Sequence, residues 1–298
     1  MRLSNPVMTA SGTAGHGAEL ARYLDLGGLG AVVVKSLSAE PWAGNPAPRV
    51  TEVDAGMLNS VGLQNPGVEA WLEDELPALV GTGARIVASI WGFSVEAYAK
   101  AATALAAAPA EVVAVEVNLS CPNVHGGDRR AVFAHSPSLT AEAVEATAGC
   151  RRPRWAKLSP NVTDITEIAG AALGAGADAL TLVNTVMGLA IDPETRRPRL
   201  GAGGGGLSGP AIRPVAVRAV FDVCSAFPSA PVVGVGGVAA GEHAVELLLA
   251  GAAAVQVGTA TFADPRAAGR ILVELERWCR RHHVSRVSDL VGRARADT

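Results

Sequence analysis

The sequence is poor in lysine and in closely spaced cysteines, and it has no excess of positive charge. Its 298 residues carry 25 Lys+Arg against 28 Asp+Glu, a net charge of −3, so we expect no basic surface for nucleic acid. The absence of any CxxC pair argues against zinc and iron–sulfur sites of the usual spacing, and we expect no metal. The four cysteines should stay free thiols in a reducing compartment, and they are Cys121, Cys150, Cys224 and Cys279.

Long apolar runs are also missing. The chain is 49% hydrophobic, with a mean hydropathy of +0.28, but Gly, Pro or charged residues break each run before it could cross a bilayer. The first residues show no basic stretch followed by an apolar segment and a cleavage site. We therefore expect a cytoplasmic protein without a membrane segment, whose residues 1–298 form one domain around one large core.

Eight short apolar runs alternate with stretches of helical periodicity. The runs are rich in Val, Ile, Ala and Leu, which is typical of parallel strands buried on both faces. They are Pro6–Ala10, Ala31–Val34, Ile86–Ser89, Val112–Val117, Trp155–Leu158, Ala179–Val183, Val232–Val235 and Ala254–Val257. Between them, segments such as Val68–Leu79 and Gly241–Ala250 space apolar residues three and four apart, as amphipathic helices do. The pattern predicts a single (β/α)8 TIM barrel of the α/β class. A doubly wound open sheet is the alternative, although the Gly-rich turn usual after its first strand is absent.

Three of the connections that follow strands are too long for simple turns. They run from about Ser36 to Asn65, Leu119 to Leu139 and Asn184 to Gly209. Long loops in a compact domain usually bind ligands or act as lids, so we expect all three over the C-terminal mouth of the barrel. The run Gly203–Gly206 should be too flexible to hold a shape alone, and the chain from about Val287 should be a fraying helical tail.

The residues that follow the predicted strands are unusually polar, and barrel enzymes build their active sites at this end. In chain order they are Ser11, Gly12, Lys35, Ser36, Asn118, Ser120, Cys121, Pro122, Asn123, Lys157, Asn184, Thr185, Gly236, Gly237, Gly258 and Thr259. Of the three lysines in the whole chain, Lys35, Lys100 and Lys157, the first and last therefore face one mouth. A lysine retained in so arginine-rich a chain is a candidate for a compact, tunable charge.

The glycines after the last two strands resemble the phosphate site common in such barrels. Backbone N–H groups of Gly236-Gly237 and Gly258-Thr259, with a helix N-terminus, could hold a phosphate; the alternative is that both are merely tight turns. A phosphate pocket beside two lysines and two asparagines favours a phosphorylated, electron-accepting ring such as a flavin, whose reduced form a lysine would stabilise. The same lysine could instead form a Schiff base with a carbonyl substrate.

Cys121 stands just beyond a strand, at the root of a long loop, whereas structural cysteines more often lie within elements. To accept a proton it must be a thiolate, which nearby positive charge from Lys35 or Lys157 would favour. A catalytic and a packing role both remain open on position alone.

Several motifs together resemble the class 1 dihydroorotate dehydrogenase family over nearly the whole chain. They begin with Asn5-Pro6-Val7-Met8 and end with Gly258-Thr259, and the most specific are Asn59-Ser60-Val61-Gly62-Leu63-Gln64-Asn65-Pro66-Gly67, Asn118-Leu119-Ser120-Cys121-Pro122-Asn123 and Gly205-Gly206-Leu207-Ser208-Gly209-Pro210. The resemblance implies FMN as cofactor and oxidation of (S)-dihydroorotate to orotate in pyrimidine biosynthesis. It also implies that Cys121 removes the C5 proton of the substrate while FMN accepts the C6 hydride.

The same resemblance assigns the remaining site residues. Substrate contacts are expected from Lys35, Asn59, Ser60, Val61, Gly62, Leu63, Asn118, Asn184 and Thr185. FMN contacts are expected from Ser11, Lys35, Ser36, Ser89, Asn118, Lys157, Val183, Gly209, Gly236, Gly237, Gly258 and Thr259. Asparagine amides suit both the donors and the acceptors of a pyrimidine ring.

Within class 1, the stretches Gly62–Gly67, Gly188–Asp192 and Glu194–Pro198 look like the 1B branch. That branch implies a partner subunit that carries FAD and a [2Fe–2S] cluster and uses NAD, together with a homodimer of the barrel subunit. A fumarate-dependent 1A homodimer, a paralogue acting on another dihydropyrimidine, and a barrel that binds a ligand without catalysis are the alternatives. Three features depart from the family pattern: Ser89 replaces an asparagine expected to face the flavin, Ala14 replaces an aromatic residue, and the loop His125–His135 is long and basic.

Overall fold

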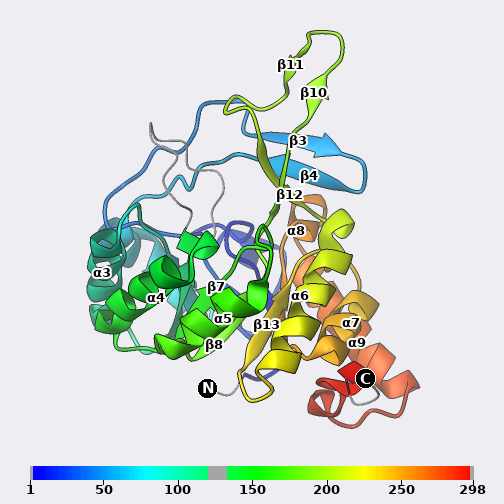
Figure 1. Cartoon of the computed structure of the whole chain (residues 1–298). Helices are drawn as coiled ribbons and strands as arrows, with labels where there is room; N and C mark the ends of the chain where they lie inside the picture. Colours follow the sequence, from blue (N-terminus) through cyan, green and yellow to red (C-terminus); the bar gives the residue numbers. More distant parts are fainter. Residues whose placement is uncertain (1–2, 120–132, 296–298) are drawn as a thin grey trace.

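A computed structural model describes residues 3–119 and 133–295 and shows a barrel of parallel strands surrounded by helices (Figure 1). The strands follow the order β1-β14-β13-β8-β7-β6-β5-β2, and a parallel bridge from Met8 to Ala31 joins the two ends of the sheet. Their bounds are β1 Val7–Thr9, β2 Val32–Val33, β5 Ile86–Ile90, β6 Val112–Asn118, β7 Arg154–Lys157, β8 Ala179–Leu182, β13 Val232–Val235 and β14 Ala254–Val257. All eight predicted strands are confirmed, and the open sheet is wrong.

One side chain adds to the few backbone hydrogen bonds at the seam between β1 and β2. Strand β2 is only two residues long, and the fully buried Thr9 supplies polar groups that a longer ladder would provide. The Val33 N–H donates to Thr9 Oγ1 at 2.8 Å, and the Thr9 hydroxyl donates to the Val33 carbonyl at 3.3 Å. Because buried backbone groups need partners, this hydroxyl completes the closure of the barrel.

Helices cover the outside of the barrel and pack their apolar faces on it (Figure 1). Their bounds are α1 Val68–Ala70, α2 Leu76–Val80, α3 Val95–Ala104, α4 Pro137–Ala146, α5 Ile165–Gly174, α6 Arg213–Ala226, α7 Gly241–Ala250, α8 Ala260–Ala263 and α9 Ala267–Arg281. Ser94, Ser136 and Asp164 cap α3, α4 and α5 by accepting backbone N–H groups of the first turn. A π-helical turn, Trp71–Glu75, joins α1 to α2. None of the described helices is long and apolar enough to cross a membrane.

The inside of the barrel changes from apolar to polar along the strands. An apolar cluster fills its lower part and includes Val87, Ala114, Trp155, Ala179 and Ala254. Two residues further along the same strands, the side chains become Ser89, Glu116, Lys157, Thr181 and Gln256, all at most 3% exposed. Since side chains two apart face the same side of a strand, this second set forms a buried polar layer above the apolar one.

Two of the long connections build an antiparallel sheet above the mouth, which we call the roof (Figure 1). Its order is β3-β4-β12-β9, with bounds β3 Val50–Val53, β4 Gly56–Asn59, β12 Gly205–Ser208 and β9 Val186–Gly188. A hairpin of β10 Ile191–Asp192 and β11 Arg197–Pro198 projects beyond it. Strand β12 pairs with β4 on one side and β9 on the other.

The expectation for Gly203–Gly206 needs correction, because its second half lies in this central strand. A Cβ on Gly205 would come within 2.4 Å of the Asn59 carbonyl oxygen, and one on Gly206 within 2.0 Å of Thr185 Oγ1. Glycine is therefore needed here for close approach of neighbouring elements rather than for freedom.

The C-terminal segment also differs from the expected fraying tail. It forms two short 3-10 turns, Val287–Leu290 and Arg293–Arg295. Leu290 is 5% exposed and belongs to the core, and the Gly292 N–H donates to the Leu248 carbonyl of α7 at 3.0 Å. An apolar anchor and a backbone hydrogen bond thus hold the segment against α7.

Candidate active site

A cavity of about 760 Å³ lies between the mouth of the barrel and the roof. Most of the residues predicted from the sequence line it. They are Ser11, Lys35, Ser36, Asn59, Val61, Leu63, Asn118, Lys157, Val183, Asn184, Thr185, Gly209, Gly236, Gly237, Gly258 and Thr259. The fold thus gathers residues from both ends of the chain around a single cavity that suits a ligand of cofactor size.

Ser60, Gly62 and Ser89 are not among the described residues that line the cavity. Ser60 is fully buried and accepts a hydrogen bond from Asn45 Nδ2 at 2.9 Å. The Gly62 carbonyl accepts from Trp42 Nε1 at 2.9 Å, and a Cβ on Gly62 would lie 2.5 Å from Asn45. Ser60 and Gly62 therefore contact other residues of the same loop, whereas their neighbours Asn59, Val61 and Leu63 line the cavity.

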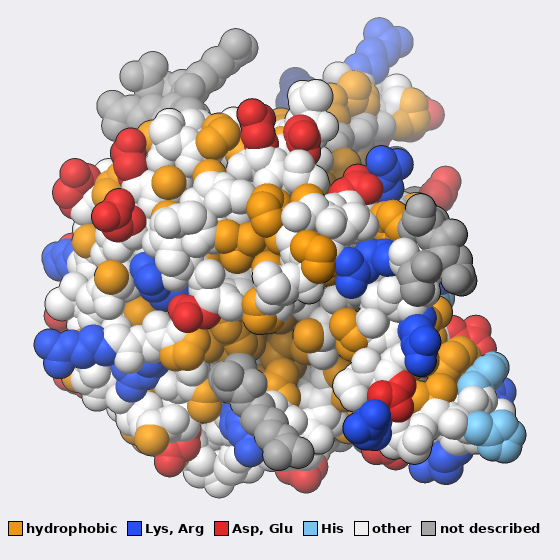
Figure 2. Space-filling view, turned by 60° about the horizontal axis from the view of Figure 1, so that its bottom comes forward, with side chains coloured by type: hydrophobic (Ala, Val, Ile, Leu, Met, Phe, Trp, Pro, Cys, Tyr) orange, Lys and Arg blue, Asp and Glu red, His pale blue; other side chains and the backbone are white. Residues whose placement is uncertain are grey.

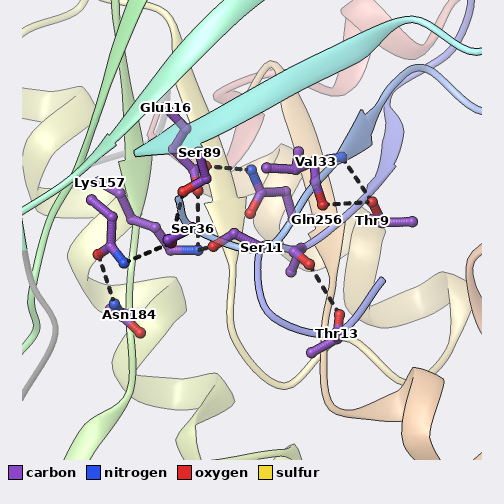
Figure 3. Close-up of polar contacts among 12 residues, drawn as sticks. Thr9, Ser11, Thr13, Val33, Ser36, Ser89, Glu116, Lys157, Asn184 and Gln256 are labelled. Atoms are coloured by element: carbon purple, nitrogen blue, oxygen red, sulfur yellow. Dashed lines mark hydrogen bonds and ion pairs between the residues drawn. The ribbon is translucent and has the colours of Figure 1, made fainter. Parts of the chain in front are cut away.

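Ser89 belongs to a chain of hydrogen bonds beneath the cavity wall (Figure 3). Its Oγ lies 2.9 Å from Ser36 Oγ, which also accepts from Asn118 Nδ2 at 3.0 Å. Asn184 Nδ2 donates to Asn118 Oδ1 at 3.2 Å, and Tyr98 donates from α3 to the Asn118 carbonyl at 2.8 Å. The two asparagines are therefore held in fixed orientations, as the recognition of a planar ring requires.

Lys157 reaches into the barrel from the end of β7 and is 3% exposed (Figure 3). Its Nζ donates to Ser11 Oγ at 3.0 Å and lies 3.5 Å from Glu116 Oε1. Glu116 Oε2 accepts from Gln256 Nε2 at 2.8 Å. A buried ammonium thus stands at the base of the cavity with a buried carboxylate as its partner.

Lys35 also lines the cavity, from the loop after β2. Gly12 lies beside it: the Cβ position of this glycine is 3.5 Å from Lys35 Nζ, and its φ of +90° is a conformation that favours glycine. Burial lowers the pKa of His16, and the positive charge of Lys35 lowers it further. A neutral imidazole is thereby favoured beside the positive charge of Lys35.

Two glycine-rich turns form the far end of the cavity. Gly236 and Gly237 have φ of +134° and +73°, and Cβ atoms on them would come within 2.7 Å of Ala216 and 2.5 Å of Arg213 in α6. Only glycine allows α6 to pack so closely behind a turn whose backbone faces the cavity. Thr259 donates to Ser208 Oγ at 2.8 Å, which ties the second turn to the roof. This backbone cradle has the form that binds phosphate in other barrels.

Sequence reasoning missed three residues of this network. Glu116 and Gln256 lie within predicted strands, where a polar side chain among apolar neighbours was a usable signal because such strands are buried on both faces. Asn161 follows the fifth strand; it donates to the Thr185 carbonyl at 2.9 Å and accepts from the Met187 N–H at 2.8 Å. It holds the start of the loop that leads into the roof.

The predicted base lies beyond what the structure describes. Cys121, and with it Ser120 and most of the basic loop 125–135, fall outside the described residues. The other three cysteines are buried, and burial raises the pKa of Cys150, Cys279 and Cys224, the last to about 11. Their buried positions suit a packing role for these three thiols.

Comparisons with known proteins agree with this site. The family model for dihydroorotate dehydrogenase matches residues 1–278. The chain is 51% identical over 295 residues to the dihydroorotate dehydrogenase B (NAD(+)) catalytic subunit of Desulforudis audaxviator, covering 99% of this chain and 95% of that protein. It is 48% identical over 293 residues to the protein of the same name from Trichlorobacter lovleyi, covering 98% and 95%. A Solibacter usitatus protein, provisionally named dihydroorotate dehydrogenase A (fumarate), is 51% identical over 292 residues, covering 97% and 94%.

These matches span almost the whole chain and include the strand ends, the roof and the glycine turns that build the cavity. The family is flavin-dependent, which suits a cavity with a buried lysine and a phosphate-type cradle. This chain belongs to the dihydroorotate dehydrogenase family.

Proposed function

We propose that this chain oxidises (S)-dihydroorotate to orotate with FMN, as the catalytic subunit of a class 1B enzyme of pyrimidine biosynthesis. The observation that carries the proposal is the cavity of a dihydroorotate dehydrogenase family member, which Lys35 and Lys157 line together with a glycine cradle. A cationic mouth suits the carboxylate of dihydroorotate, and the cradle suits a phosphate ester.

The residues present fit FMN. The cradle of Gly236, Gly237, Gly258 and Thr259 would take the phosphate, because its backbone faces the cavity and side chains are excluded behind it. Lys157 and Ser11 would meet the ring system, with Ser36 and Val183 beside them and Gly209 above. Ser89, which does not line the cavity, would contribute indirectly through Ser36. When bound, FMN would supply the acceptor for the substrate's hydride.

The protein's own groups then have separable tasks. Lys35 would pair with the substrate carboxylate, and Asn59, Asn118, Asn184 and Thr185 would hold the pyrimidine ring by donating and accepting hydrogen bonds. Cys121 would take the C5 proton as a general base, as in the family. The fixed amides of Asn118 and Asn184 would hold the substrate in one orientation, which turns an encounter into a reactive arrangement.

The class 1B enzyme and its class 1A alternative differ in their electron acceptor, which is NAD for 1B and fumarate for 1A. The names of the first two relatives describe catalytic subunits that work with NAD(+), so we propose a partner subunit carrying FAD and a [2Fe–2S] cluster. The name of the Solibacter relative mentions fumarate, but other relatives of similar identity carry the NAD(+) name, so the fumarate-dependent alternative is not favoured. The expected homodimer of the barrel subunit stays a prediction.

Anaerobic half-reactions test the proposal. Purified chain reconstituted with FMN should lose its yellow colour on addition of dihydroorotate. Reoxidation by NAD should then require the partner subunit, whereas reoxidation by fumarate alone would favour the 1A alternative. Failure of the chain to bind FMN, with or without the partner subunit, would refute the proposed function. Borohydride trapping of a carbonyl substrate on Lys157 would favour a Schiff-base lyase instead.

A further inference from the structure

We infer that Glu116, itself clamped by Gln256, is a positioning residue that holds the charged Lys157 side chain at the base of the cavity. The inference rests on the proposed FMN site and adds two residues to it. Neither Glu116 nor Gln256 lies among the described residues that line the cavity, so neither is placed to touch a ligand there. They would act through Lys157, which does line it.

Burial makes the pairing necessary. Glu116 and Gln256 are 0% exposed and Lys157 is 3% exposed, so water cannot solvate the two charges. An isolated buried charge is strongly disfavoured, so a carboxylate that loses its ammonium partner, or the reverse, is destabilising. Lys157 can therefore present a full positive charge to the cavity only while the Glu116 carboxylate stays beside it.

The geometry fixes which carboxylate oxygen meets the lysine. Gln256 Nε2 donates to Glu116 Oε2 at 2.8 Å, which leaves Oε1 facing Lys157 Nζ at 3.5 Å. Strands β6 and β14 lie on opposite sides of the barrel, with three strands between them either way around the sheet. The Gln256 amide thus holds Glu116 from across the interior (Figure 3).

Ser11 provides the second contact that defines the position of the ammonium. Its Oγ accepts from Lys157 Nζ at 3.0 Å, and it follows β1, on the opposite side of the barrel from β7. Lys157 is therefore extended across the interior between one hydroxyl in the cavity wall and one carboxylate below it. Removing the carboxylate should let the ammonium move away from this position, which takes positive charge from the base of the cavity.

The test uses FMN-reconstituted protein and two equilibrium measurements that do not depend on turnover. The dissociation constant of FMN is measured by fluorescence, and the dissociation constant of sulfite, an anion that adds to the flavin and senses local positive charge, by bleaching of the flavin absorbance. We expect Glu116→Gln and Lys157→Met each to weaken sulfite binding about tenfold or more, a change worth ~1.4 kcal/mol. The double variant should show no further loss, because non-additivity is the sign that one residue acts through the other.

Two more variants guard against a purely structural effect. Glu142→Gln removes an exposed carboxylate on α4 and should change neither constant. Gln256→Leu keeps both charges but frees Glu116 from its clamp, and it should weaken sulfite binding in the same direction by a smaller factor. It also serves as the test should Glu116→Gln not fold.

The outcomes separate this inference from the proposed function. Additive losses in the double variant, or unchanged or tighter sulfite binding in Glu116→Gln, would overturn the role of Glu116. If Gln256→Leu stands in for Glu116→Gln, unchanged sulfite binding in it overturns the inference equally. If the wild-type chain binds no FMN, the proposed function and this inference are both refuted. If it binds FMN but dihydroorotate does not reduce the flavin, only the proposed function is refuted.

Discussion

Replacing Thr9 by valine should open the weakest point of the barrel, the seam between β1 and β2. The hydroxyl of Thr9 accepts from the Val33 N–H at 2.8 Å and donates to the Val33 carbonyl at 3.3 Å, in a site that is 0% exposed. Valine has the same shape but leaves the buried N–H without an acceptor, which costs about 1–3 kcal/mol. For a protein of this size we expect the apparent Tm to fall by roughly 2–4 °C for each kcal/mol lost.

Thr9→Ser is the matched control for the hydroxyl. It keeps the hydrogen bonds and loses one methyl group, worth ~0.8 kcal/mol of apolar burial. If packing alone mattered, valine would be neutral and serine destabilising; if the hydroxyl matters, valine is the more destabilising of the two. Thermal melts of both variants without cofactor decide the order, and a Thr9→Val protein at least as stable as Thr9→Ser would refute the reasoning. Because β1 and β2 lead to Ser11 and Lys35, Thr9→Val should also bind FMN more weakly.

Other predictions concern the cavity and its chemistry. Cys121→Ser should slow flavin reduction by dihydroorotate by ~10²–10⁴-fold in anaerobic stopped flow, because a hydroxyl is a far weaker base; an unchanged rate would remove Cys121 from its role. Lys35→Met should raise the dissociation constant of orotate at least about tenfold, as the loss of one charge-assisted hydrogen bond implies. Lys100→Met is the control, because Lys100 is an exposed residue of α3 that pairs with Glu40, and this substitution should leave the dissociation constant of orotate unchanged. Gly206→Ala should lower both Tm and orotate affinity, because the added Cβ would collide with Thr185 Oγ1. Gly204→Ala is the control and should have a smaller effect, because the nearest atom to its added Cβ, the Gly188 carbonyl oxygen, lies at 3.2 Å. Equal effects of the two substitutions would argue against the roof geometry. At pH 8, iodoacetamide should label Cys121 faster than Cys150, Cys224 or Cys279 in the folded protein, since burial raises the pKa of those three thiols. Mass spectrometry of the labelled peptides measures the four rates. Faster labelling of any of the other three cysteines would argue against Cys121 as the reactive thiol.

The fold and most of the cavity wall could be predicted from local patterns. Each strand appeared as an apolar run because parallel strands are buried on both faces, and many site residues stood at the end of a run because that is where a barrel opens. Asn59 to Leu63 and Gly209 were instead assigned by the family motifs. The same logic could have found Glu116 and Gln256, which stand two residues beyond Ala114 and Ala254 and so face the same interior. Residues such as Ser60 and Gly62 were placed in the right loop, but the side on which each one faces depends on contacts with Asn45 and Trp42 that no local pattern contains.

The sequence by itself determined the alternation of strands and helices, the polar strand ends and the family motifs, because all of these depend on residues close together in the chain. Only the tertiary structure decided which distant groups meet. The bonds from Gln256 to Glu116 and from Lys157 to Ser11 join opposite sides of the barrel over 140 and 146 residues of sequence. Likewise, the glycines of β12 form part of a roof because β4 and β9, from two separate loops, pair on either side of them. Closure of the sheet brings these groups together, and closure depends on the whole chain.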